Sequence, residues 1–145
     1  MTNIKIQNLK SKFEYYIKKF KIENSHSPRF NEECGVFGIS GSEDAAPLTA
    51  LGLHALQHRG QEGCGIVSYD GNSYHSERKF GLVGDNFTKK QSLKKLVGNI
   101  AIGHNRYSTT GGETIRNIQP FYADLYGGAI AIAHNGNLTN ALLLR

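Results

Sequence analysis

Apolar and polar residues follow one rhythm before residue 34 and another after it. In the first part, apolar side chains recur every three or four positions, which is typical of an amphipathic helix; they are Ile6, Leu9, Phe13, Ile17 and Phe20. Residues 24–28, with the sequence NSHSP, then break the helical pattern. Beyond residue 34, short apolar runs alternate with glycine-containing turns. The pattern therefore predicts a helical arm over residues 1–33 and a domain of mixed α and β structure over residues 34–145.

The predicted domain begins with a strand over residues 36–39 and continues with a helix. Asp44 is a suitable N-cap for this helix, Pro47 fits its first turn, and Gly60 ends it. The side chains expected on its apolar face are Leu48, Leu51, Ala55 and Leu56.

A β-meander is expected after this helix. Residues 65–69 form an apolar strand, Asp70-Gly71 is a hairpin turn, and residues 73–80 form the returning strand. A second short helix is predicted over about residues 88–96.

The positive charge of the chain is concentrated in the arm. Six lysines and Arg29 outnumber four glutamates within residues 1–33, which accounts for +3 of the formal net charge of +5. A basic amphipathic helix is able to bind an acidic surface, a membrane or RNA. The alternative is a solvated propeptide that has no role after its removal. A targeting presequence fits poorly, because such segments are rich in arginine and serine and poor in acidic residues.

The cysteine content and the apolar runs exclude several classes of protein. Two cysteines argue against a disulfide scaffold. The sequence has no apolar run of about 18 residues, the length expected of a membrane span. It also has no short apolar segment behind a charged start, as a secretory signal would require. We therefore expect a cytoplasmic protein, in a reducing compartment.

The border between arm and domain falls at Cys34, within the sequence EECGVFGI of residues 32–39. A cysteine at a chain terminus carries its own base, because its α-amino group is able to take the proton of its thiol. Removal of residues 1–33 would turn Cys34 into such a nucleophile, and Gly35 would leave room for a substrate. The alternative is a small buried residue at the start of a strand, which is the usual role of a free cysteine.

Polar clusters follow two predicted buried strands of similar sequence, residues 100–104 and 129–134, each of which ends in His-Asn. Sites are commonly built from loops at strand ends. Asn135-Gly136 offers a side-chain amide and a backbone N–H that suit the oxyanion formed when a thiolate attacks an amide. Arg106 has the bidentate fork that suits a substrate carboxylate. The alternatives are that Asn-Gly is a turn and that Arg106 is a surface charge.

Five motifs in the same order closely resemble the glutaminase domain of the amidophosphoribosyltransferase family. They are CGVFGI at residues 34–39, LQHRGQE at 56–62, GHNRYST at 103–109, QPF at 119–121 and AHNGNLTN at 133–140. The related glucosamine-phosphate synthases typically have a sequence like EYRGYD in place of the QHRGQE found here. Five ordered motifs over about residues 32–145 favour a resemblance to the amidophosphoribosyltransferase family over these synthases.

The resemblance implies an α+β fold, the four-layer αββα sandwich of the N-terminal nucleophile class. It also implies that Cys34, exposed by removal of residues 1–33, attacks the side-chain amide of glutamine, forms a glutamyl thioester and releases ammonia. By motif position, Asn135 and Gly136 would form the oxyanion hole. The family uses the ammonia to make phosphoribosylamine from phosphoribosyl pyrophosphate in purine biosynthesis.

Three further residues are expected to bind glutamine by motif position. Arg106 would hold the α-carboxylate, Thr109 would line the same pocket, and Arg59 lies in a loop that closes over glutamine in the family. The residues expected to have structural roles are Cys64, His58, His104 and His134.

The family's glutaminase domain is longer than residues 34–145 and is followed by a phosphoribosyltransferase domain. We therefore expect these residues to be the N-terminal part of a type 2 amidotransferase domain, truncated inside a helix that begins near Asn137. Glutamine is the ligand expected for this segment, with no cofactor, metal ion, membrane or nucleic acid. Phosphoribosyl pyrophosphate and magnesium would bind the further domain, and a full-length enzyme would be a homo-oligomer.

Three hypotheses of function follow. The chain is the glutaminase part of an amidophosphoribosyltransferase, an inactive remnant of that enzyme, or a binding module that acts through its basic arm. A coding frame that continues past Arg145 would favour the first, and residues 1–33 retained in the mature protein would favour the third.

Overall fold

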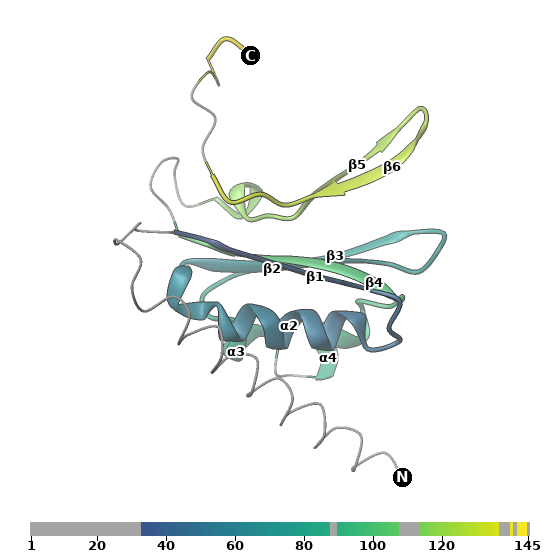
Figure 1. Cartoon of the computed structure of the whole chain (residues 1–145), viewed down its shortest axis with the longest axis horizontal. Helices are drawn as coiled ribbons and strands as arrows, with labels where there is room; N and C mark the ends of the chain where they lie inside the picture. Colours follow the sequence, from purple (N-terminus) through teal and green to yellow (C-terminus); the bar gives the residue numbers. More distant parts are fainter. Residues whose placement is uncertain (1–32, 88–89, 108–113, 137–139, 141, 145) are drawn as a thin grey trace, which may run out of the picture. The chain divides into compact units, whose positions relative to one another are not determined.

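The structure is a computed structural model that describes residues 33–87, 90–107, 114–136, 140 and 142–144. The chain divides into two units, Met1–Asn31 and Glu32–Arg145, and all described helices and strands belong to the second (Figure 1). The predictions for the arm, for Thr109 and for a helix that begins near Asn137 fall on positions outside the described residues. None of the described helices is long and apolar enough to cross a membrane.

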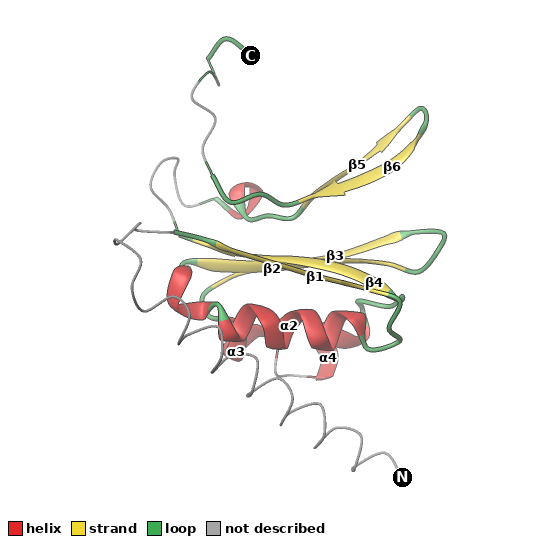
Figure 2. Ribbon diagram, in the orientation of Figure 1, coloured by secondary structure: helices red, strands yellow, loops and turns green. Residues whose placement is uncertain are grey.

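Four antiparallel strands form the main sheet (Figure 2). They are β1 (Gly35–Ser40), β2 (Gly63–Tyr69), β3 (Tyr74–Phe80) and β4 (Ile100–Arg106), in the spatial order β1-β4-β2-β3. The four predicted strands and the β2–β3 hairpin are confirmed. The next strand in the chain, β4, does not extend this hairpin at β3 but pairs with β1 and β2. Its central place explains why most of its residues are buried.

Helical segments cover one face of this sheet (Figure 1). They are α2 (Ala45–Ala55), the 3-10 turn η1 (Gln57–Arg59), α3 (Val83–Phe87) and α4 (Lys90–Lys94). Asp44 takes the N-cap position of α2 but makes no side-chain capping bond. Gly60 ends the helical segment as predicted, although the last turn is η1 and not α-helix. Of the region predicted as helix 88–96, α4 is confirmed, whereas α3 was not predicted.

The face of α2 that packs on the sheet differs from the predicted one. The buried residues are Ala45, Ala46, Thr49, Ala50, Gly52 and Leu53, whereas Leu51 is 49% exposed. The helix lies so close to the sheet that a Cβ added to Gly103 of β4 would be 2.6 Å from Leu53 Cδ1 and 2.8 Å from Thr49 Cγ2. The contact between α2 and β4 therefore contains mainly small residues of α2. The prediction, which was based on large apolar residues, placed the buried face on the wrong side of the helix.

A second sheet has two described strands, β5 (Phe121–Leu125) and β6 (Gly128–Ile132), preceded by the 3-10 turn η2 (Ile115–Asn117). β5 was not predicted. β6 was predicted to be buried but is exposed over most of its length, because β5 is its one partner among the described strands. The chain before β5 packs on the main sheet, where a Cβ on Gly65 of β2 would collide with the Gln119 carbonyl oxygen. Strand residues alternate between faces, so this contact lies on the face opposite α2.

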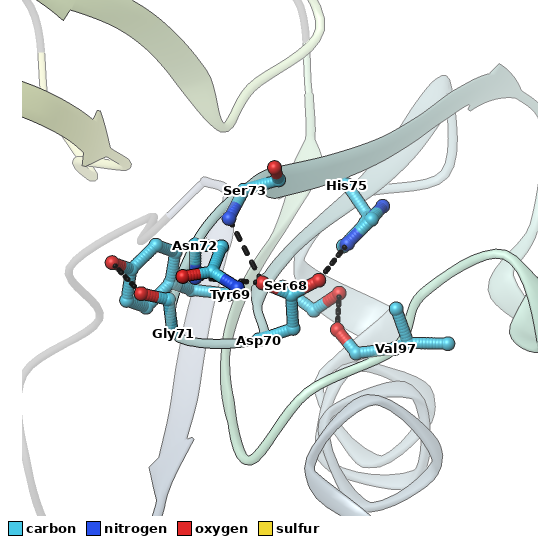
Figure 3. Close-up of polar contacts among 8 residues, drawn as sticks. All are labelled: Ser68, Tyr69, Asp70, Gly71, Asn72, Ser73, His75 and Val97. Atoms are coloured by element: carbon cyan, nitrogen blue, oxygen red, sulfur yellow. Dashed lines mark hydrogen bonds and ion pairs between the residues drawn. The ribbon is translucent and has the colours of Figure 1, made fainter.

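The turn between β2 and β3 is organised by Asp70 (Figure 3). Asp70 Oδ2 lies 2.8 Å from His75 Nε2, and Asp70 Oδ1 accepts the backbone N–H groups of Ser73 and Asn72, each at 2.8 Å. The His75 contact, followed by the two backbone bonds, holds the pKa of Asp70 well below its usual range. The loop between the strands has four residues, Asp70 to Ser73, whereas the predicted strands left three between them, residues 70–72.

Candidate active site

Strand pairing places Cys34 beside the end of β4. Gly35 is paired with Asn105 in the antiparallel β1–β4 register, so the residue before Gly35 lies next to the residues after Asn105. The Tyr107 N–H donates to Cys34 Sγ at 3.4 Å, and the Cys34 thiol is 3.6 Å from the Tyr107 carbonyl oxygen. Cys34 is half-buried. The predicted nucleophile is thus held by backbone groups and still accessible.

Arg59 contacts Cys34 twice, from the end of η1. Its carbonyl oxygen accepts the Cys34 N–H at 2.7 Å, and its Nε donates to the Cys34 carbonyl oxygen at 2.8 Å. The turn reaches this position because Gly60 packs against the backbone of β4, where a Cβ would be 2.9 Å from atoms of Asn105 and Arg106. Only glycine fits so close to a neighbouring strand. Arg59 therefore holds both the N–H and the carbonyl oxygen of Cys34, the predicted nucleophile.

The backbone of Cys34 is strained. Its φ of 68° lies in the left-handed region, and Cys34 is the one described residue other than glycine with a positive φ. Such a conformation costs a residue with a side chain on the order of 1–3 kcal/mol. The φ torsion of Cys34 exists only while its nitrogen is bonded to the carbonyl carbon of Glu33. Cleavage of that bond would release the strain.

Asn135 reaches the same cysteine from the chain after β6. Its Nδ2 donates to the Cys34 carbonyl oxygen at 3.4 Å. The preceding residue is anchored, because the His134 N–H donates to Gln119 Oε1 at 2.8 Å. Gly136 follows with a φ of 149°, in a region where glycine is favoured. The side-chain amide of Asn135 therefore lies beside Cys34, although the two residues are 101 positions apart in the sequence.

Arg106 is held at the end of β4 by two groups. Its Nε lies 3.1 Å from Glu62 Oε1, and its Nη1 donates to the Asn117 carbonyl oxygen at 2.7 Å. The Arg106 and Glu62 side chains are 12% and 20% exposed. The guanidinium is therefore oriented by a partly buried ion pair and does not behave as a surface charge. The prediction that a loop follows residue 104 is wrong, because β4 continues through Arg106.

The second cysteine and the buried histidine have environments of a different kind. Cys64 is fully buried, and burial raises the pKa of its thiol to about 11, despite a smaller opposing effect from Asn86. Near neutral pH it stays a thiol, which is a poor nucleophile. His104 is also buried. Burial, with a smaller contribution from the nearby charges of His134 and Arg106, lowers its pKa to about 4. Both residues fit the structural roles predicted for them.

Three of the predicted site residues thus meet at one place: Cys34, Arg59 and Asn135. Gly136 follows Asn135 directly, and Arg106 precedes Tyr107, whose backbone touches the thiol. Sequence reasoning missed this backbone contact and the Glu62 partner of Arg106. A backbone contact leaves no signal in residue type, whereas the carboxylate in the QHRGQE motif was a visible candidate.

Comparison with known protein families identifies the class to which this chain belongs. The family of class II glutamine amidotransferases matches residues 34–143, and the chain belongs to this family. Within it, curated relatives are amidophosphoribosyltransferases. The protein of Rhizobium etli is 64% identical over 115 residues, and that of Staphylococcus aureus is 53% identical over 116 residues. Each alignment covers 79% of this chain and 23% of the relative.

Solved structures agree with these relatives. One, described as the allosteric regulatory enzyme of purine biosynthesis, matches with a TM-score of 0.69 and 48% identity. Another, the glutamine phosphoribosylpyrophosphate amidotransferase of B. subtilis in complex with ADP and GMP, has a TM-score of 0.66 and 46% identity. Both matches cover 75% of this chain and 23% of the other. The predicted α+β fold of the N-terminal nucleophile class is confirmed. The chain spans about a quarter of the length of these four proteins.

Proposed function

We propose that this chain is the glutaminase part of an amidophosphoribosyltransferase, and that it hydrolyses the side-chain amide of glutamine. One observation carries the proposal: Cys34, Arg59 and Asn135 converge from three distant parts of the chain. The Asn135-Gly136 turn or the free cysteine alone would support a structural role. Their convergence at a strained, partly exposed cysteine supports a nucleophile with its stabilising groups.

The reaction begins at the Cys34 sulfur. The α-amino group of Cys34 takes the thiol proton, and the thiolate attacks the amide carbon of glutamine, which forms the S–C bond. The ammonium returns a proton to the leaving nitrogen as the C–N bond breaks, so that ammonia departs and a glutamyl thioester remains. Water then attacks the thioester, which yields glutamate and restores the thiol. None of these proposed reaction steps uses an oxidant or a metal ion.

Two kinds of group are proposed to act on the substrate: donors to the oxyanion and residues that bind glutamine. Asn135 Nδ2 would donate to the oxyanion of the tetrahedral intermediate, together with the Gly136 N–H. In the structure this amide donates to the Cys34 carbonyl oxygen at 3.4 Å, within reach of the nucleophile. Arg106 would bind the α-carboxylate of glutamine, and Glu62 would orient its guanidinium. Arg59 and Thr109 are proposed to line the same pocket.

The mechanism requires Cys34 to be the first residue, because otherwise its nitrogen belongs to an amide and has no basic lone pair. We therefore propose cleavage between Glu33 and Cys34 in the mature protein. The left-handed φ of Cys34 supports this, since cleavage relieves the strain. The family match, which begins at residue 34, supports it as well.

The remaining activities belong to the complete protein. We propose that its phosphoribosyltransferase part uses the ammonia with phosphoribosyl pyrophosphate to make phosphoribosylamine, with magnesium bound in that part, in a cytoplasmic homo-oligomer. No cofactor is proposed for residues 34–145. The remnant hypothesis is disfavoured because the site residues are held in one place, and the hypothesis of a binding module rests on the arm alone.

Ammonia release from glutamine tests the proposal in the complete, processed protein. Cys34→Ala should lower kcat roughly a thousandfold or more, because the nucleophile is lost. Cys64→Ala is the matched control and should leave kcat within about threefold of wild type, because the Cys64 thiol is buried and protonated. Equal activity of the wild type and Cys34→Ala would contradict the proposal.

A further inference from the structure

Gln57 links the 3-10 turn η1 to helix α3. Its side-chain Nε2 donates to the Gly60 carbonyl oxygen, and its Oε1 accepts the Val83 N–H at 2.6 Å. Val83 is the first residue of α3. One partner is an acceptor and the other a donor, so only one orientation of the amide satisfies both. Gln57 therefore ties two segments together with both ends of its side chain.

The turn that Gln57 holds is the one that contacts Cys34. Besides the two Gln57 side-chain bonds, the turn is closed by the Arg59 N–H, which donates to Leu56 O at 2.9 Å, and by the Gly60 N–H, which donates to Gln57 O at 3.2 Å. Arg59 uses its carbonyl oxygen and its Nε to hold the Cys34 backbone. Movement of the turn would therefore displace Cys34.

The Arg106 side of the site has separate anchors. The Glu62 N–H donates to the Arg106 carbonyl oxygen at 3.2 Å, and the Gly81 N–H donates to the Glu62 carbonyl oxygen at 2.8 Å. These backbone bonds fix Glu62 to the end of β4 and to the chain after β3. The ion pair between Glu62 and Arg106 therefore does not depend on the Gln57 side chain.

We propose that Gln57 is a positioning residue that holds Arg59 and, through it, the Cys34 thiol in its reactive place. The proposal rests on the proposed role of Cys34 as nucleophile. Arg59 is also proposed to line the glutamine pocket, but the carboxylate clamp at Arg106 has its own anchors. Loss of Gln57 therefore slows the chemical step far more than it weakens glutamine binding. A displacement of about 1 Å in a reacting group is able to cost on the order of a hundredfold in rate.

Two variants of the complete, processed protein test this role. Gln57→Met keeps the length of the side chain and removes both bonds. Gln57→Glu keeps the acceptor for Val83 and replaces the donor to Gly60 with a carboxylate oxygen, so it tests the turn alone and perturbs the fold less. For both, kcat for glutamine hydrolysis and the rate of Cys34 alkylation by iodoacetamide should fall about tenfold or more, with KM within about threefold of wild type.

Two controls separate positioning from general loss of stability. Asn86 belongs to the same helix α3, and Asn86→Ala removes bonds from Asn86 Nδ2 to Phe80 O at 2.7 Å, to Leu82 O at 3.0 Å and to Cys64 Sγ at 3.7 Å. It should lower Tm and leave kcat and the alkylation rate of the folded protein unchanged. Gln91→Glu makes the same change of amide to carboxylate at an exposed position of α4. It should change none of these quantities.

Three results would overturn the proposal: kcat and alkylation within about twofold of wild type in both Gln57 variants, a change confined to KM, or an equal loss of kcat in Asn86→Ala. The alkylation rate needs no glutamine. If the wild type failed to hydrolyse glutamine, the proposed function would be wrong, and alkylation would still decide whether Gln57 positions the thiol.

Discussion

The groups that hold Cys34 are mostly backbone atoms. Its sulfur contacts the N–H and carbonyl of Tyr107, and its N–H donates to the carbonyl of Arg59. Substitution of side chains does not remove backbone groups, so these contacts depend on where the strands and the turn place the chain. The side chains that add specific chemistry are Arg59 and Asn135. Mutation of Asn135 therefore separates catalysis from turn geometry.

Asn135→Ala should lower kcat for glutamine hydrolysis roughly a hundredfold or more with little change in KM, because an oxyanion donor acts mainly in the transition state. Arg106→Ala should instead raise KM, because a carboxylate clamp acts on bound glutamine in the ground and transition states alike. Steady-state kinetics of the complete protein distinguish the two.

Ammonia-dependent synthesis in the same protein provides the control, since added ammonia bypasses the glutaminase step. It should survive both substitutions. If Asn135→Ala abolished this reaction as well, or lowered Tm with kcat intact, Asn135 would be a structural turn residue.

At the scale of elements, close packing of α2 on the sheet determines the core. Gly103→Ala should lower the free energy of unfolding by about 1–3 kcal/mol, because its Cβ would overlap Leu53 and Thr49 in the buried contact. Gly127→Ala is the matched control, since a Cβ there meets no atom within 4 Å. Urea denaturation of both variants measures the difference. Equal stability of the two would show that the layers separate easily.

The Asp70 turn adds a pH dependence to the β2–β3 hairpin. The pKa of Asp70 is depressed in the folded state, so its contribution is present above the unfolded pKa of about 3.9 and is lost as the pH falls toward the folded value. Asp70→Asn should therefore be less stable than wild type at pH 6, and the difference should shrink below about pH 4. Denaturation curves at several pH values test this. A difference that is independent of pH would mean that the charge of Asp70 plays no part.

The sequence predicted elements better than their arrangement. Strand periodicity and the Asp-Gly turn identified β1, β2, β3 and β4, because alternating apolar residues and turn residues act locally. The central place of β4 depends on pairing between distant segments, which no local pattern encodes. The small residues of α2 were missed because apolar periodicity favours large side chains. β5 was missed because Ala123 and Asp124 interrupt its short apolar run.

At the scale of the whole molecule, the site joins the beginning and the end of the described domain. Cys34 precedes β1 and Asn135 follows β6, with a contact of 3.4 Å between them. Both were predicted as site residues from their motifs, whereas their contact depends on the fold. The arm over residues 1–33 must be removed before Cys34 has a free amine, so processing and catalysis are expected to be coupled.

Whether Cys34 is an N-terminal nucleophile is tested most directly by peptide mass mapping of the mature, complete protein after reaction with a glutamine analogue that has an electrophilic side chain. One adduct is expected, on the sulfur of Cys34, in a peptide whose first residue is Cys34. An adduct on Cys64, or on Cys34 in a peptide that still contains Glu33, would contradict this role.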